Sequence, residues 1–130
     1  VYVDVDDNIE GEVEYYLISG LDISLDEIGP LVKERGGIVI PAHVERPAFS
    51  MTSQLGVIVP GPWAALEVVR LPPSIDTLNY PLTTSSDAHY PEHVARRPFT
   101  LDVSREELCP NGKDADMASL EKALSLRQRQ

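Results

Sequence analysis

Apolar residues near position 30 recur at a spacing that predicts a helix. From Leu25 to Val32 they follow the three-to-four-residue period of a helix with one buried face. Ser24, with Glu27 three residues later, has the capping-box pattern that is typical of helix N-termini. Pro30 interrupts the pattern, so this helix is either kinked there or begins with the proline in its first turn.

Strands and helices are expected to alternate along the rest of the chain. Residues 38–40 are a continuous β-branched apolar run, which indicates a strand buried on both faces. Further strands are expected at residues 66–69, 82–86 and 99–103, short helices near residues 50–55 and after Pro91, and a last amphipathic helix over residues 117–124. This alternation favours an α/β fold with parallel strands.

The N-terminal region has a different pattern. Residues 1–5 alternate apolar and acidic side chains, which predicts a strand with one solvated face. Residues 10–16 fit either a strand or a helix.

Composition restricts the classes of protein to which the chain can belong. Its 130 residues are enough for one domain, 1–130, and not for a second core. Acidic residues outnumber basic ones by 21 to 11, and a net charge of -10 disfavours a basic nucleic-acid surface. The apolar runs are too short to span a membrane. Cys109 is the single cysteine, which excludes an internal disulfide and fits a reducing, cytoplasmic location.

The most informative short motif is Asp87-Ala88-His89, which follows the strand expected at 82–86. Residues two apart on an extended chain point to the same side and lie about 6–7 Å apart. A carboxylate and an imidazole so placed can reach one metal ion or two neighbouring ones. The alternative is that Asp87 caps the next helix and His89 is a surface histidine.

His43 occupies the same kind of position, just after the strand expected at 38–40. The C-terminal ends of parallel strands are where α/β folds place their active sites. Histidine combined with carboxylate ligands suits zinc, manganese or iron. The alternative for His43 is a packing role in which its ring is hydrogen-bonded. Arg46 follows on the same loop and fits either a bidentate contact to an anionic substrate or a surface ion pair.

Three further charged residues are interpreted more simply. Glu67 lies among apolar residues in an expected strand, so it needs a partner if its face is the inner one and is solvated otherwise. Arg96 and Arg97 are expected to be surface charges.

Four segments, taken together, resemble the PHP (polymerase and histidinol phosphatase) family of metal-dependent hydrolases. They are residues 36–47, 53–56, 65–69 and 85–89. The resemblance implies a distorted seven-stranded α/β barrel that holds two or three metal ions, zinc, manganese or iron, and hydrolyses phosphate esters. It also implies that His43, Asp87 and His89 are metal ligands and that Arg46 contacts the substrate, a phosphorylated small molecule or a nucleotide.

The chain departs from the family pattern in its N-terminal part. PHP proteins begin with a His-x-His strand and have further histidines and a glutamate that this sequence lacks. The chain therefore resembles the C-terminal half of the domain, a partial (β/α)7 barrel without its N-terminal strands. Its start at Val1 also suggests a piece of a longer protein. We expect a metal-dependent phosphoesterase with an incomplete metal site, inactive as the 130-residue chain alone.

A non-enzymatic function is the main alternative. In it, the chain is an assembly module or a ligand-binding α/β module whose histidines are structural. Half a barrel exposes strand edges, which favours self-association or pairing with the missing N-terminal half.

Overall fold

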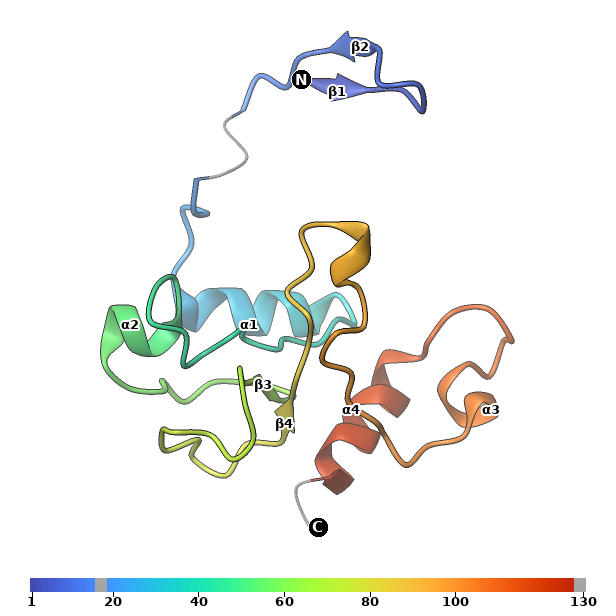
Figure 1. Ribbon diagram of the computed structural model, residues 1–130. Coiled ribbons are helices and arrows are strands. Elements are labelled where there is room, and N and C mark those ends of the chain that lie inside the picture. The colour runs from blue at the N-terminus through green and yellow to red at the C-terminus, as the bar shows by residue number, and fades with distance from the viewer. Residues whose placement is uncertain (16–18, 128–130) are drawn as a thin grey trace.

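The computed structural model of the chain describes residues 1–15 and 19–127. Its elements are β1 (Tyr2–Val3), β2 (Ile9–Gly11), α1 (Leu25–Glu34), α2 (Met51–Leu55), β3 (Leu66–Glu67), β4 (Leu82–Thr83), the 3-10 helix η1 (Pro91–His93), α3 (Arg105–Leu108) and α4 (Met117–Arg127). Helices and strands together confirm a mixed α/β fold (Figure 1). Within the described ranges, the strands form two separate two-stranded sheets and no closed barrel.

The strands β1 and β2 form an antiparallel hairpin that lies apart from the other elements (Figure 1). Its turn is organised by Asp4, whose carboxylate accepts hydrogen bonds from the backbone N–H groups of Asp6 (2.8 Å) and Asn8 (2.9 Å). The strand expected at 1–5 is thus confirmed over two residues. Of residues 10–16, the first two belong to β2, and residue 16 lies outside the described residues.

Helix α1 begins where the capping box predicts. The backbone N–H and the hydroxyl of Ser24 both donate to the Glu27 carboxylate, at 3.0 and 2.6 Å. The helix continues through Pro30, so the alternative start at the proline is wrong. Its buried contact is at Gly29, where a Cβ would lie 2.4 Å from Cγ of Pro62. Glycine therefore allows α1 to pack directly against the segment that leads into β3.

The capping box gives a pH-dependent prediction. The hydrogen bonds from Ser24 hold the pKa of Glu27 below its ordinary value of 4.5. Because the folded pKa is lowered, this stabilisation is present above pH 4.5 and is lost as the pH falls through the folded pKa. We expect Ser24→Ala to return the pKa of Glu27 towards 4.5 in a carbon NMR titration. The control is Glu107, whose pKa is lowered by Ser104 and stays unchanged. An unaltered Glu27 titration would contradict this origin of the shift.

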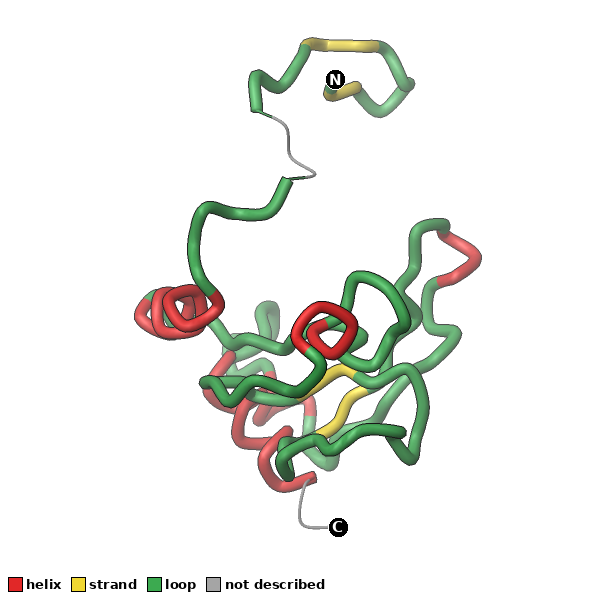
Figure 2. Tube along the Cα trace, turned by 90° about the vertical axis from the view of Figure 1, so that its left-hand side faces the viewer, coloured by secondary structure: helices red, strands yellow, loops and turns green. Residues whose placement is uncertain are grey.

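The centre of the fold is a small parallel arrangement with β3 in the middle. Leu66 pairs with Leu82 in the parallel β3–β4 sheet (Figure 2). On the other side of β3, an extended segment of residues 39–41 runs parallel to it, joined by a bridge from Val39 to Trp63. The connecting backbone hydrogen bonds run from Ala64 N–H to Val39 O (2.9 Å), Glu67 N–H to Pro41 O (3.0 Å), Leu66 N–H to Pro81 O (2.8 Å) and Val68 N–H to Thr83 O (2.9 Å). The expected parallel pairing is therefore present, although the paired runs are shorter than predicted.

Buried side chains cover both faces of this arrangement. One cluster consists of Val44, Ile58, Trp63, Leu66 and Val68. The other joins Ala64 and Ala65 to Leu124 of α4. The C-terminal helix predicted from its apolar spacing thus contributes to the core, and it anchors the end of the chain against the segment that contains β3.

Two sequence-based expectations about strands are not met. Residues 99–103 form no strand; the Thr100 carbonyl, which a partner strand would bind, instead accepts a hydrogen bond from Nη1 of Arg127. The partial (β/α)7 barrel is not confirmed either, because the described strands make two separate pairs rather than one continuous wall. No helix in the described parts of the chain has the length and apolar character needed to cross a membrane.

Candidate functional site

The loops that follow the three parallel segments surround a cavity of about 280 Å³. Its charged and imidazole side chains are His43, Glu45, Arg46, Arg70, Asp87 and Arg97. The first three follow segment 39–41, Arg70 follows β3, and the last two follow β4. Because parallel strands bring their C-terminal ends to one edge of a sheet, residues distant in sequence meet here. Three of the four predicted site residues, His43, Arg46 and Asp87, line this cavity.

His43 is held at the start of this edge by its neighbour. Val44 is fully buried, and its N–H donates to the Glu67 carbonyl (2.9 Å). The His43 ring nitrogen Nδ1 is buried and has no hydrogen-bond partner; it is the one such side-chain atom among the described residues. A buried polar atom without a partner costs about 1–3 kcal/mol, so the lone Nδ1 is an unsatisfied group of this loop. The alternative of a packing histidine with a hydrogen-bonded ring is therefore not met at Nδ1.

Asp87 forms an ion pair across the cavity. Its Oδ2 lies 2.7 Å from Nη1 of Arg46, and both side chains are about two-thirds buried. His43 and Asp87 have positive φ angles of 32° and 48°, in a region that L residues adopt rarely and that recurs at functional sites. Of the alternatives for Arg46, the structure shows an ion pair, and it is partly buried rather than on the surface.

His89 lies beside Asp87 rather than deep in the cavity. Its Nδ1 is 2.9 Å from the Asp87 carbonyl and 4.0 Å from Asp87 Oδ1. The side chain is 72% exposed. Asp87 and His89 therefore lie close together, but the positive φ of Asp87 means that the chain is not extended there as predicted, and His89 lies on the solvent side.

The loop geometry explains why Arg46 reaches Asp87. The Arg46 N–H donates to the His43 carbonyl (3.0 Å), which closes a tight turn. The Arg46 carbonyl in turn accepts from the hydroxyl of Ser50 (2.6 Å), the N-cap of α2. The start of α2 therefore fixes the loop that carries both His43 and Arg46.

Glu67 and Glu45 are carboxylates with structural partners. Glu67 accepts from the Ser85 hydroxyl (2.6 Å), so the expectation that an inward-facing Glu67 needs a partner is met by a serine. Glu45 accepts from the backbone and hydroxyl of Ser74, both at 2.8 Å, and from the Arg70 N–H at 3.3 Å. Burial raises the pKa of Glu45, but these hydrogen bonds and the Arg70 charge lower it by more. Glu45 thus ties the 70–74 loop to the loop of His43.

Arg97 is the residue that the sequence analysis placed wrongly. It was expected on the surface, yet it is half-buried and lines the cavity. Its Nη1 donates to the Val69 carbonyl (3.0 Å). Its neighbour Arg96 is exposed, and the Nε of that residue is bound to the Glu92 carbonyl (3.3 Å). No local sequence signal separates the two arginines, because the difference arises from the contact with residue 69.

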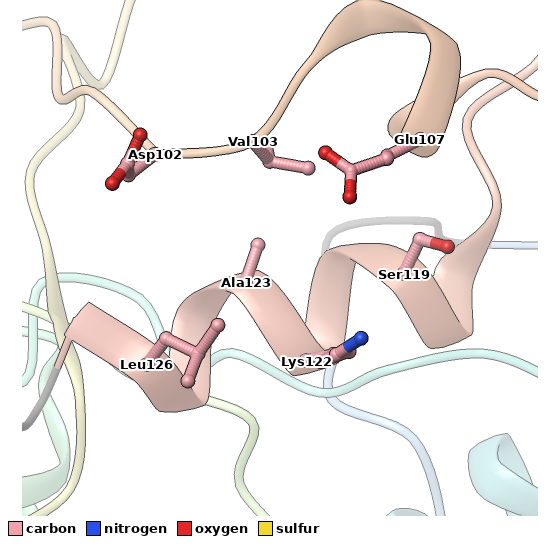
Figure 3. A pocket seen from close by; sticks show the side chains of 7 residues that line it. All are labelled: Asp102, Val103, Glu107, Ser119, Lys122, Ala123 and Leu126. Carbon is pink, nitrogen blue, oxygen red and sulfur yellow. The ribbon is translucent and has the colours of Figure 1, made fainter.

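A second cavity of about 210 Å³ lies between α4 and the chain before α3 (Figure 3). In Figure 3 the carboxylates of Asp102 and Glu107 lie on one side of it, and Lys122 and Ala123 of α4 on the other. Ser104 hydrogen bonds lower the pKa of Glu107, and the Lys122 charge contributes. None of the residues singled out from the sequence lines this cavity.

The first cavity partly fits a metal ion. The free Nδ1 of His43 and the carboxylate of Asp87 are the donor types that zinc, manganese and iron accept. Among the described residues, no group of three or more His, Cys, Asp or Glu side chains is arranged to hold an ion. His43 and Asp87 thus line one cavity, without a third group of these types arranged beside them in the described residues.

Comparison with known proteins gives no match: no family model, curated protein or solved structure is similar to the chain at a significant level.

Proposed function

We propose that this chain forms one side of a metal-dependent phosphoesterase site. In this proposal His43 and Asp87 are metal ligands, and His89 completes the set from the solvent side. The observation that carries it is that His43, whose buried Nδ1 has no hydrogen-bond partner, lines the same cavity as Asp87. A zinc, manganese or iron ion bound there would act as a Lewis acid and would neutralise charge on a phosphate ester.

The chain's own groups have distinct tasks in this site. His43 Nδ1 has a free lone pair when the ring is neutral with its proton on the other nitrogen. Asp87 uses Oδ2 for Arg46, so its Oδ1 is left for an ion. Arg46 uses one N–H for that bond, and its remaining N–H groups can bind phosphate oxygens. The same ion pair thus orients both the ligand and the substrate contact.

The proposed site is incomplete, which determines the expected activity. A catalytic zinc site has three protein ligands and one open position, and here two donors line the cavity while the third is largely exposed. We expect weak metal binding and no hydrolysis of a generic phosphate ester by the 130-residue chain. Activity would need the N-terminal half implied by the PHP resemblance. The single free Cys109 is compatible with a reducing, cytoplasmic location of this chain.

The test is to compare two histidine variants by titration calorimetry with zinc and with manganese. His43→Ala removes the free nitrogen, and we expect it to weaken binding by more than about tenfold. His93→Ala is the matched control, because His93 lies in η1 and packs edge-on against Tyr90, and it is not among the residues that line the cavity. Equal affinities for the two variants would refute the role of His43.

One observation favours the alternative of an assembly module. The β1–β2 hairpin lies apart from the other elements (Figure 1) and exposes Tyr2 (51%), Val5 (99%) and Ile9 (69%). Exposed apolar side chains on a short strand pair favour contact with a partner strand. In this alternative we expect the chain to self-associate in sedimentation and Ile9→Asp to shift it to monomer. Val57→Asp, at a site 63% exposed elsewhere, should have no such effect. A monomeric wild-type chain contradicts the alternative.

A further inference from the structure

The cavity around His43 and Asp87 concentrates positive charge in an acidic chain. The protein has a net charge of -10 and only 11 basic residues. Three of these, Arg46, Arg70 and Arg97, line this one cavity. Glu45 and Asp87 also line it, so three guanidinium groups face two carboxylates, and the cavity has one excess positive charge in a chain that is acidic as a whole.

The three arginines differ in their partners. Arg46 is paired with Asp87 at 2.7 Å. Arg70 and Arg97 have no carboxylate within 4.0 Å among the described residues. The other carboxylate of the cavity, Glu45, is hydrogen-bonded by Ser74 and by the backbone N–H of Arg70. Arg97 therefore has no ion-pair partner among the described residues, whereas Arg70 interacts with Glu45 through charge alone, from beyond 4.0 Å.

Arg97 is also held in place. Its Nη1 donates to the Val69 carbonyl at 3.0 Å, and the side chain is half-buried. A guanidinium has five N–H donors in a rigid fork, so this bond leaves donors free to bind an anion. A pre-positioned arginine loses less rotamer freedom when it binds a phosphate or carboxylate than a freely exposed one.

We infer that Arg97, together with Arg70, forms a second anion subsite in this cavity, so that the site selects small ligands with two anionic groups. One group binds at the Arg46–Asp87 side and the other at Arg97. The assignment of the first group rests on the proposed phosphoesterase function. A volume of about 280 Å³ is near the lower end of small-molecule pockets, which span roughly 300–1,000 Å³, and it suits a phosphorylated metabolite rather than a polymer.

The test compares glucose 1,6-bisphosphate with glucose 6-phosphate as probes for the 130-residue chain, by titration calorimetry in metal-free buffer. Hydrogen bonds to a charged group contribute roughly 1.5–3 kcal/mol, so we expect the bisphosphate to bind at least about tenfold more tightly. Arg97→Gln should remove this preference and leave glucose 6-phosphate affinity unchanged. Arg96→Gln, the adjacent exposed arginine, should preserve the preference.

Two results would overturn the subsite: equal binding of the two sugars by the wild-type chain, or the same loss of preference in both variants. The circular dichroism spectrum of Arg97→Gln is the control for folding, and we expect it to match that of the wild type. A zinc titration of Arg97→Gln separates this inference from the phosphoesterase proposal, because the variant should bind zinc like the wild type. If zinc does not bind at all but the bisphosphate preference depends on Arg97, the anion subsite stands and the phosphoesterase proposal fails.

Discussion

Replacing Asp87 with asparagine is expected to lower the affinity of the chain for zinc or manganese by more than about 100-fold. Loss of an outer-shell partner already costs roughly 10- to 100-fold, and Asp87 is proposed to bind the ion directly. The amide keeps the shape of the side chain but removes the negative charge, which also releases Arg46 from its 2.7 Å ion pair. Titration calorimetry of the wild type and the variant measures the change.

Two controls separate metal binding from folding in this experiment. Asp114→Asn removes the same charge from an exposed position near the C-terminal end, and it should leave metal affinity unchanged. In the double variant with Arg46→Gln, the unpaired arginine is absent, so stability should recover relative to Asp87→Asn alone. Metal affinity should stay low in both. If stability and metal affinity recover together, Asp87 is a structural residue and not a ligand.

Replacing Leu66 with alanine is expected to destabilise the chain by about 2–5 kcal/mol, the usual range for a buried leucine. Leu66 is fully buried in β3, the central strand, and its backbone is paired on the β4 side. Such a loss is a large part of the free energy of unfolding, which is typically about 5–15 kcal/mol for a domain. Urea denaturation followed by the fluorescence of Trp63, which belongs to the same cluster, measures the difference.

The control for the core is Leu55→Ala in α2. Leu55 is 54% exposed, so its replacement should change stability by no more than about 0.5 kcal/mol. If Leu55→Ala proves as harmful as Leu66→Ala, the parallel arrangement around β3 is not the centre of the fold. A weakened metal affinity in a folded Leu66 variant is also expected, because β3 holds Val44 and hence His43.

Local patterns in the sequence predict the elements whose causes are local. The capping box joins Ser24 to Glu27, which are neighbours within a few residues, so the start of α1 could be placed from it. The position of the cavity was predicted as well, because the C-terminal ends of successive parallel strands lie at one edge of the sheet. His43, Asp87 and Arg46 follow from that rule and from residue type.

Long-range contacts explain what the sequence could not predict. Arg96 and Arg97 have similar sequence surroundings, and only the structure shows that Arg97 donates a hydrogen bond to the Val69 carbonyl. Glu45 becomes a cavity residue through hydrogen bonds to the 70–74 loop. Residues 99–103 have the apolar pattern of a strand, but the Thr100 carbonyl accepts a hydrogen bond from the Arg127 side chain rather than from a partner strand. Each case depends on a partner far along the chain.

The most direct test of the central claim is anomalous X-ray scattering from crystals of the chain soaked with zinc or manganese. Our account predicts a peak within bonding distance of both His43 Nδ1 and the Asp87 carboxylate. The account would be contradicted by a peak that occurs only elsewhere, for instance at the acidic turn of Asp4. It would also be contradicted if no peak occurs in this cavity at a metal concentration that saturates the crystals.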